Sequence, residues 1–276
     1  MGISKKKRGF LLFLILILGL FSGCQTQTTK AAVRTEEIDL SVYPKGEYFI
    51  TAQEVKELIG RDDLVLLDCN KPDLYEKEHI KGAIGIGFHA FSNKVGKPGD
   101  LGWGTLKSKE DLADKLVELG IDNQKTVVFY SNVFKGPGAD GRAVWQLSQA
   151  GMDNVKILLG GTTYWKELGY EMTSDLTETP VASDGVILKD YDSSFCASKE
   201  SIFNNLGQEF LLDVRTEKEY KGSQNAGEPR GGHIAGADHL LWTDFLEENG
   251  VLKSPQAIES IMTSLNVSKD DDFTLY

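Results

Sequence analysis

The chain has 276 residues, of which 41% are hydrophobic and 26% are charged, and its formal net charge is −11. This composition excludes an intrinsically disordered protein, and the length allows two domains of ordinary size. The negative charge argues against binding of nucleic acid or anionic lipid through the body of the protein.

The amino terminus has the features of an export signal. A basic cluster at residues 5–8 precedes an apolar run at 10–21, which is too short to span a bilayer as a stable anchor. The run ends in Ser22-Gly23-Cys24 and resembles the lipobox of bacterial lipoproteins, with Phe21 where leucine is usual. The resemblance implies that residues 1–23 are a signal peptide and that Cys24 is lipidated. An ordinary signal peptide with an incidental cysteine is the alternative.

Lipidation would place the protein in the cell envelope, anchored on the extracytoplasmic side of the membrane. Without the four basic residues of the leader, the chain has 26 basic and 41 acidic residues, a net charge of −15. Residues 24–45 are polar and rich in threonine, which predicts a tether between the membrane and the folded part.

A first domain is expected over residues 46–172. A capping box of Thr51 and Glu54 predicts its first helix, and the apolar run at 64–67 predicts a central parallel strand ending in Asp68. The later expected elements are a strand at 84–88, a helix capped by Ser108, a strand at 126–130, a helix at 142–150, a strand at 155–159 and a helix at 164–169.

A polar linker is expected at 173–185, and a second domain at 186–276 repeats the first. The pattern His-Ile-x-Gly-Ala occurs at residues 79–83 and again at 233–237. Ser108 lies 22 residues before Tyr130, and Ser254 lies 22 residues before Tyr276. The first domain continues for 39 residues from Tyr130 to Gly169, so we expect the second to be incomplete and to end before the loop that follows its strand.

Together these motifs resemble the tandem-domain rhodanese family of thiosulfate and mercaptopyruvate sulfurtransferases. The resemblance implies an α/β fold with two rhodanese-like domains, each a mostly parallel five-stranded sheet flanked by helices, the second truncated. The motifs that carry it are residues 67–68, Tyr75, 79–83 and 155–169 in the first repeat, and residues 212–215, 219–220, 232–237 and 253–255 in the second.

In that family a cysteine follows the strand tyrosine, and its thiolate takes a sulfane sulfur from a small donor. The persulfide then passes the sulfur to a thiol or to cyanide. Ser131 occupies the cysteine position of the first repeat, and a serine cannot carry a persulfide. The family's cysteine is therefore expected directly after Tyr276, and the 276 residues alone are expected to be inactive.

Four residues are candidates for supporting the site or binding substrate: Asp213, Arg215, Arg230 and His233. The arginines would attract a small anionic donor, but Glu219 stands where thiosulfate-using members have arginine and would repel it. Structural roles are the alternative, namely backbone hydrogen bonds for His233, a turn for Asp213 and an ion pair for Arg215. No metal and no cofactor are expected.

Other interpretations remain open at this stage. Ser131 is either an esterase-like nucleophile or a loop serine, and no motif supplies it with a His–Asp pair. Cys69 is expected to be a buried, inert thiol, and Cys196 lies before a helix cap. The rival functions are a non-catalytic binding or scaffold lipoprotein and an inactive fragment. The sequence leaves open the physiological donor and acceptor, and the oligomeric state.

Overall fold

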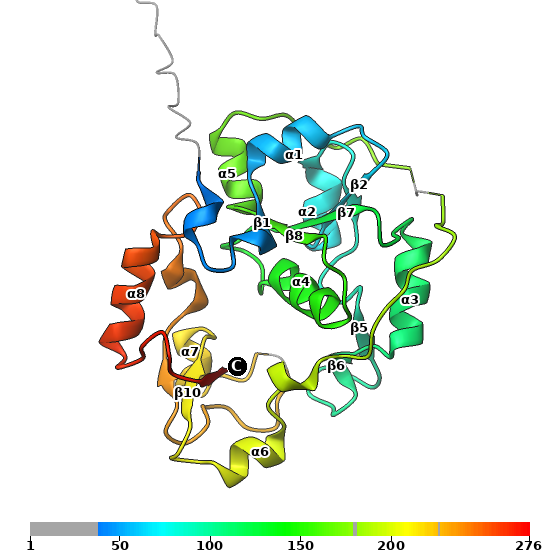
Figure 1. Ribbon diagram of the computed structural model, residues 1–276. Helices are drawn as coiled ribbons and strands as arrows, with labels where there is room; N and C mark the ends of the chain where they lie inside the picture. The colour runs from blue at the N-terminus through cyan, green and yellow to red at the C-terminus, as the bar shows by residue number, and fades with distance from the viewer. Residues whose placement is uncertain (1–37, 179–180, 226) are drawn as a thin grey trace, which may run out of the picture. The chain divides into compact units, whose positions relative to one another are not determined.

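The computed structural model describes residues 38–178, 181–225 and 227–276. The larger sheet has five strands in the order β1-β8-β7-β2-β4, and every neighbouring pair is parallel (Figure 1). Its strands are β1 (Phe49–Ile50), β2 (Leu64–Asp68), β4 (Ile84–Gly85), β7 (Thr126–Tyr130) and β8 (Val155–Leu158). The expected α/β fold with a parallel five-stranded sheet is therefore confirmed for the first repeat.

Helices cover both faces of this sheet, as expected for parallel strands with nearly continuous apolar sequences. They are α1 (Ala52–Leu58), α2 (Pro72–Lys77), α3 (Lys109–Glu118), α4 (Ala139–Gln149) and α5 (Gly161–Glu167). Successive residues of β7 point to opposite faces, so Phe129 packs with α3 and α4 while Val128 and Tyr130 pack with α1 and α5 (Figure 1). The sheet thus separates two apolar cores.

The local signals for helix starts are confirmed. Thr51 and Glu54 form the expected capping box of α1, and the Ser108 hydroxyl accepts from Asp111 N at the start of α3. Several predicted boundaries were wrong, among them those of the helix expected at 164–169, which is Gly161–Glu167. The strand expected at 84–88 stops at Gly85, because Ile86 N and Gly87 N both turn to donate to Asp68 O. The helix expected from residue 142 begins at Ala139, directly after Gly138 in a left-handed conformation.

Two short antiparallel pairs accompany the larger sheet. They are β3 (His79–Ile80) with β9 (Met172–Thr173), and β5 (Ser92–Lys94) with β6 (Trp103–Leu106). Single 3-10 turns lie at Leu40–Val42, Gly46–Tyr48, Ser193–Phe195 and Trp242–Phe245. Neither pair was expected from the sequence.

The second repeat has a three-stranded parallel sheet in the order β11-β10-β12. Its elements are α6 (Lys199–Asn204), β10 (Phe210–Asp213), α7 (Glu217–Tyr220), β11 (Asp238–His239), α8 (Pro255–Ser264) and β12 (Phe273–Leu275). The strands β10, β11 and β12 correspond in order and pairing to β2, β4 and β7. The predicted domain and linker boundaries stay a prediction.

Individual contacts are repeated as well as strand order. Ile80 N donates to the Tyr130 hydroxyl at 3.0 Å, and Ile234 N donates to the Tyr276 hydroxyl at 2.9 Å. In the same way, Cys69 N donates to Tyr130 O and Val214 N donates to Tyr276 O. The structure therefore places Tyr276 as the counterpart of Tyr130, as the spacing predicted.

Removing the hydroxyl of Tyr130 should destabilise the protein because it leaves the buried N–H of Ile80 without an acceptor. We expect Tyr130→Phe to cost about 1–3 kcal/mol in the free energy of unfolding, measured by urea denaturation. Tyr276→Phe is the matched variant. Tyr276 is only partly buried, so water can replace its hydroxyl and the cost should be smaller. Equal, negligible effects would show that the two hydroxyls do not hold the following turns.

Candidate functional site

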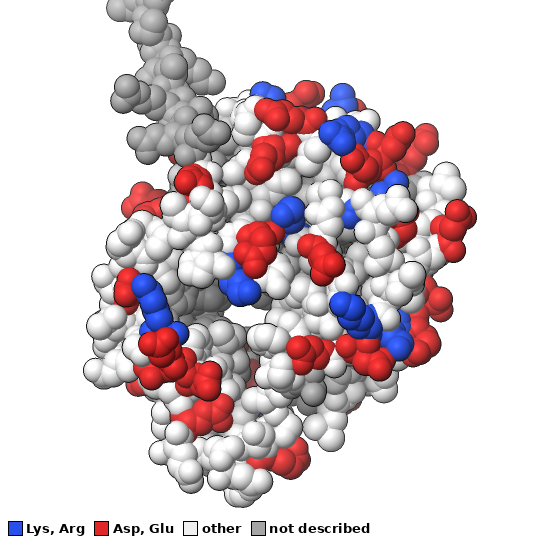
Figure 2. All heavy atoms as spheres, in the orientation of Figure 1, with Lys and Arg blue, Asp and Glu red and all other residues white. Residues whose placement is uncertain are grey.

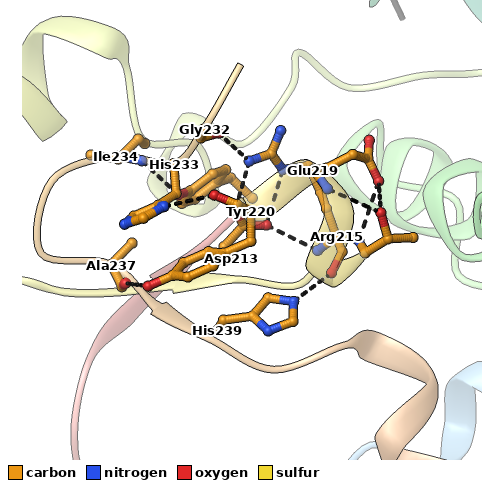
Figure 3. Close-up of polar contacts among 11 residues, drawn as sticks. Asp213, Arg215, Glu219, Tyr220, Gly232, His233, Ile234, Ala237 and His239 are labelled. Carbon is orange, nitrogen blue, oxygen red and sulfur yellow. Dashed lines mark hydrogen bonds and ion pairs between the residues drawn. The ribbon is translucent and has the colours of Figure 1, made fainter. Parts of the chain in front are cut away.

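The candidate site lies at the carboxyl end of the second sheet, where β10 ends in Asp213. The Asp213 carboxylate is fully buried, and Arg215 forms a two-pronged ion pair with it, from Nε at 2.9 Å and Nη2 at 2.5 Å (Figure 3). Arg215 Nη2 also donates to Gly232 O at 2.9 Å. The guanidinium carbon lies 5.4 Å from the centre of the Tyr276 ring. Arg215 thus ties β10 to the turn at Gly232 and to the end of β12.

Two effects oppose each other at Asp213. Burial raises the pKa of its carboxyl, but hydrogen bonds from the side chain and backbone of Arg215, together with its charge, outweigh burial and leave the pKa lowered. The pKa of Arg215 is raised, chiefly by its hydrogen bond to Asp213, and the charge of Glu219 adds to this effect. Both groups therefore stay ionised and paired.

Aromatic rings stack beside this ion pair. Tyr220 and His233 are stacked with ring centroids 3.7 Å apart, and His233 Nδ1 donates to Tyr220 O at 2.8 Å. On the first repeat, Tyr75 and His79 make the same stack and the same hydrogen bond. The backbone role that the sequence analysis gave as the alternative for His233 is what the structure shows. His239 also packs against Tyr220 and donates from Nε2 to Arg215 O at 2.8 Å.

Glu219 lies in α7, the short helix that follows Arg215. Its carboxylate accepts hydrogen bonds from the hydroxyl of Thr216 at 2.5 Å and from Thr216 N at 3.2 Å, forming the capping box of α7. Asp213, Arg215 and Glu219 together carry one net negative charge.

The structure brings together three of the four predicted residues. Asp213 and Arg215 are paired, and Gly232, which precedes His233, accepts from Arg215. Arg230 is exposed, in the segment between Tyr220 and His233. Within the described residues no hydrogen bond or ion pair joins Arg230 to the other three. His239 was missed, although its place at the end of β11, opposite Asp213, follows from the repeat.

At the corresponding place in the first repeat, Ser131 is locked in the structure. Its side chain is fully buried, its hydroxyl donates to Asp140 Oδ2 at 2.9 Å, and its carbonyl accepts from Thr162 N. Its partner is a carboxylate, so the Ser–His–Asp arrangement of an esterase is not formed here. Burial raises the pKa of Asp140, and the hydrogen bond from Ser131 opposes that shift. Ser131 serves as a loop-holding residue.

The first repeat also lacks the arginine. Asn70 stands where the second repeat has Arg215, and its Oδ1 accepts from Asn132 N at 2.8 Å, one residue beyond Ser131. Asp68, the counterpart of Asp213, has its pKa raised by burial, against a hydrogen bond from Asn70 N. Asn70 therefore fixes the loop of the first repeat directly, whereas Arg215, at the same position of the second repeat, pairs with Asp213.

The expected burial of Cys69 is confirmed. Cys69 is buried, and burial together with the charges of Asp140 and Asp68 raises the pKa of its thiol. Cys196 is exposed, and both are free thiols. Cys24 lies outside the described residues. In the part of the chain that the structure covers, no cluster of metal-ligating side chains occurs, and no helix has the length and hydrophobicity to cross a bilayer.

The amino-acid sequence is similar to those of known rhodanese-like proteins. Residues 51–168 match the family described as rhodanese-like domain. The sulfur carrier protein TtuD of Thermus thermophilus is 26% identical over 248 residues, which cover 85% of this chain and 83% of that protein. A probable 3-mercaptopyruvate sulfurtransferase of Pseudomonas aeruginosa is 29% identical over 228 residues, with 78% of each chain covered.

Solved structures agree in fold. The crystal structure of SseA from Escherichia coli, described as a 3-mercaptopyruvate sulfotransferase with the "rhodanese" fold, has a TM-score of 0.67 and 23% identity, with 83% of this chain and 87% of that chain covered. A putative thiosulfate sulfurtransferase of Mycobacterium tuberculosis is 27% identical over 245 residues, which cover 86% of this chain and 79% of that protein. The chain therefore carries a rhodanese-like domain at residues 51–168 and is a relative of the thiosulfate and 3-mercaptopyruvate sulfurtransferases.

Proposed function

We propose that this protein is a membrane-tethered sulfurtransferase of the cell envelope that moves sulfane sulfur from a small donor to a thiol or to cyanide. The nucleophile is a cysteine at the position directly after Tyr276, the counterpart of Ser131. Asp213, Arg215, His233 and Arg230 support the site or attract substrate. The first repeat, with Ser131 locked against Asp140, is the silent partner.

One observation carries this proposal. In the second repeat, the hydroxyl of Tyr276 accepts a hydrogen bond from Ile234 N, and its carbonyl accepts one from Val214 N. In the first repeat, Tyr130 accepts the equivalent hydrogen bonds from Ile80 N and Cys69 N. The position after Tyr276 then corresponds to Ser131, at the carboxyl end of parallel strands, where α/β folds place reactive groups. The relatives supply the chemistry: a putative thiosulfate sulfurtransferase and a probable 3-mercaptopyruvate sulfurtransferase.

The reaction is a double displacement. The cysteine thiolate attacks the transferable sulfur of the donor, and the bond between that sulfur and the rest of the donor breaks. The rest of the donor leaves with the bonding electron pair, as sulfite from thiosulfate, as the enolate of pyruvate from mercaptopyruvate, or as a thiolate from a persulfide. A thiolate or cyanide acceptor then attacks the same sulfur and releases the cysteine thiolate. No external oxidant or reductant is needed.

Anchoring through Cys24 supports the same proposal from the other end of the chain. The apolar run ending in Ser22-Gly23-Cys24 supports lipidation of the Cys24 thiol after cleavage. Diacylglycerol with a further acyl chain gives durable binding to a membrane. Fractionation of cells should find the protein with the membranes, and Cys24→Ala should release it to the soluble fraction.

A sulfur-transfer assay with the natural full-length protein tests the activity. The protein should release sulfite from thiosulfate, or pyruvate from mercaptopyruvate, in the presence of cyanide or a thiol. Ser131→Ala should leave the rate within about twofold, since Ser131 only holds the silent loop. Absence of transfer with every donor, combined with saturable binding of a ligand, would instead support the scaffold function that the degenerate first repeat also allows.

A further inference from the structure

An open groove of about 490 Å³ lies beside the β5–β6 hairpin and α3, in the first repeat. Its ionisable lining residues are His89, Lys94, Lys107 and Lys115, and no aspartate or glutamate among the described residues lines it. The chain as a whole has 41 acidic and 30 basic residues, and acidic side chains are spread over the face drawn in Figure 2. The ionisable groups that line this groove are all basic, so its charge is opposite in sign to the net charge of the protein.

The charges in the groove are largely uncompensated. Within the described residues, the ammonium groups of Lys94 and Lys107 make no ion pair with the protein. Lys115 pairs with Glu118 at 2.8 Å, but the Glu118 side chain is 65% exposed and is not part of the groove lining. Surface pairs of this kind are weak, so Lys115 keeps most of its ability to attract an anion.

His89 supplies a second, independent observation. Its Nδ1 is buried and has no hydrogen-bond partner among the described residues, which is an unusual state for a buried polar atom. Burial lowers the pKa of His89, and so do the positive charges of Lys94 and Arg142. The ring is held against Trp103 with centroids 5.7 Å apart. The surroundings of His89 are therefore positive.

The lining lysines come from separate elements of the first repeat. Lys94 ends β5, Lys107 follows β6 and Lys115 lies on α3, which are neighbours in Figure 1. The Asn93 amide nitrogen bridges the hairpin by donating to Leu106 O at 2.8 Å and to the Thr105 hydroxyl at 3.2 Å. Lys94 and Lys107 are thus carried by a braced hairpin, which lowers the entropy cost of binding a ligand.

We propose that this groove binds a small tetrahedral oxyanion with two negative charges, of the phosphate and sulfate class. Lysine ammonium groups bind such ions as point charges from several directions, and three of them around one groove suit a dianion better than a carboxylate. The site is separate from the Asp213–Arg215 pair and does not depend on the proposed sulfur transfer.

Isothermal titration of the full-length protein with inorganic phosphate, at constant ionic strength set with chloride, tests this proposal. We expect saturable binding of one equivalent, weakened about tenfold or more in the double variant Lys94→Gln/Lys107→Gln. Lys109→Gln is the matched control, because Lys109 pairs with Asp190 and is outside the groove lining. Its affinity should equal that of the unchanged protein.

Chemical shifts locate the ion and distinguish outcomes. Phosphate should shift the resonances of His89 and Asn93, and thiosulfate should compete if the groove recognises the tetrahedral dianion rather than phosphate itself. Equal affinity in the double variant, or binding no stronger than that of chloride, would overturn the proposal. A melting temperature of the double variant matching that of Lys109→Gln ensures that weaker binding does not reflect unfolding.

Discussion

Replacing Glu219 by arginine is expected to raise kcat/KM for thiosulfate at least about tenfold in the full-length protein. Glu219 lies beside Arg215 and leaves the group of Asp213, Arg215 and Glu219 with one negative charge. The substitution changes the net charge of these three side chains from −1 to +1, which favours a dianionic donor through direct attraction. The measurement is sulfite release from thiosulfate at fixed ionic strength.

The variant Glu219→Gln separates charge from structure. Glutamine retains the capping box with Thr216, so the start of α7 is preserved while one negative charge is removed. We expect an intermediate gain with thiosulfate and little change with an uncharged persulfide donor. If neither substitution changes the thiosulfate rate, Glu219 does not face the donor, and the choice of donor is made elsewhere.

Replacing Asp213 by alanine is expected to destabilise the second sheet by about 2–3 kcal/mol. The carboxylate is fully buried, and its removal leaves Arg215 without a counter-charge at the end of β10. Arg215 is 31% exposed and can turn partly to water, so the cost stays below that of a fully buried pair. Hydrogen exchange of the amides in β10 and β12 measures the loss locally.

Asp68→Asn is the matched change in the first repeat, and its expected effect has the opposite sign. Asp68 is buried without an arginine, and burial raises its pKa, so a neutral amide that still accepts from Asn70 N should stabilise the sheet slightly at neutral pH. A loss at Asp68 as large as that at Asp213 would contradict the contrast between the two repeats.

The two aspartates also give opposite pH dependences. The folded-state pKa of Asp213 is lowered, so its stabilisation is present above the unfolded pKa of about 3.9 and is lost as pH falls through the lower folded value. The folded-state pKa of Asp68 is raised, so its cost appears as pH rises from about 3.9 through the folded value. Stability curves of the two variants against pH separate these effects.

The features that were predictable from the sequence are local or repeated. The helix caps at Thr51, Ser108 and Ser254 were predictable because each hydroxyl accepts a hydrogen bond from the backbone N–H only three residues later in the chain. The equivalence of Tyr130 and Tyr276 follows from their identical distance, 22 residues, from the helix caps Ser108 and Ser254. These signals depend on a few neighbouring residues or on counting along the chain.

Contacts between distant residues were not predictable. Ser131 and Asp140 lie on opposite sides of a glycine-rich loop, and nothing in its composition shows that they meet. The basic groove joins residues 89, 94, 107 and 115, whose proximity depends on a hairpin that has no clear periodic pattern.

The central claim is that the second repeat, and not the first, carries the sulfur. It is tested most directly by peptide mass spectrometry of the natural full-length protein after incubation with thiosulfate or mercaptopyruvate. We expect the peptide containing the position after Tyr276 to gain one sulfur atom, and a thiol acceptor to remove it. No gain at that peptide, or a gain only at Cys69 or the exposed Cys196, would contradict the account.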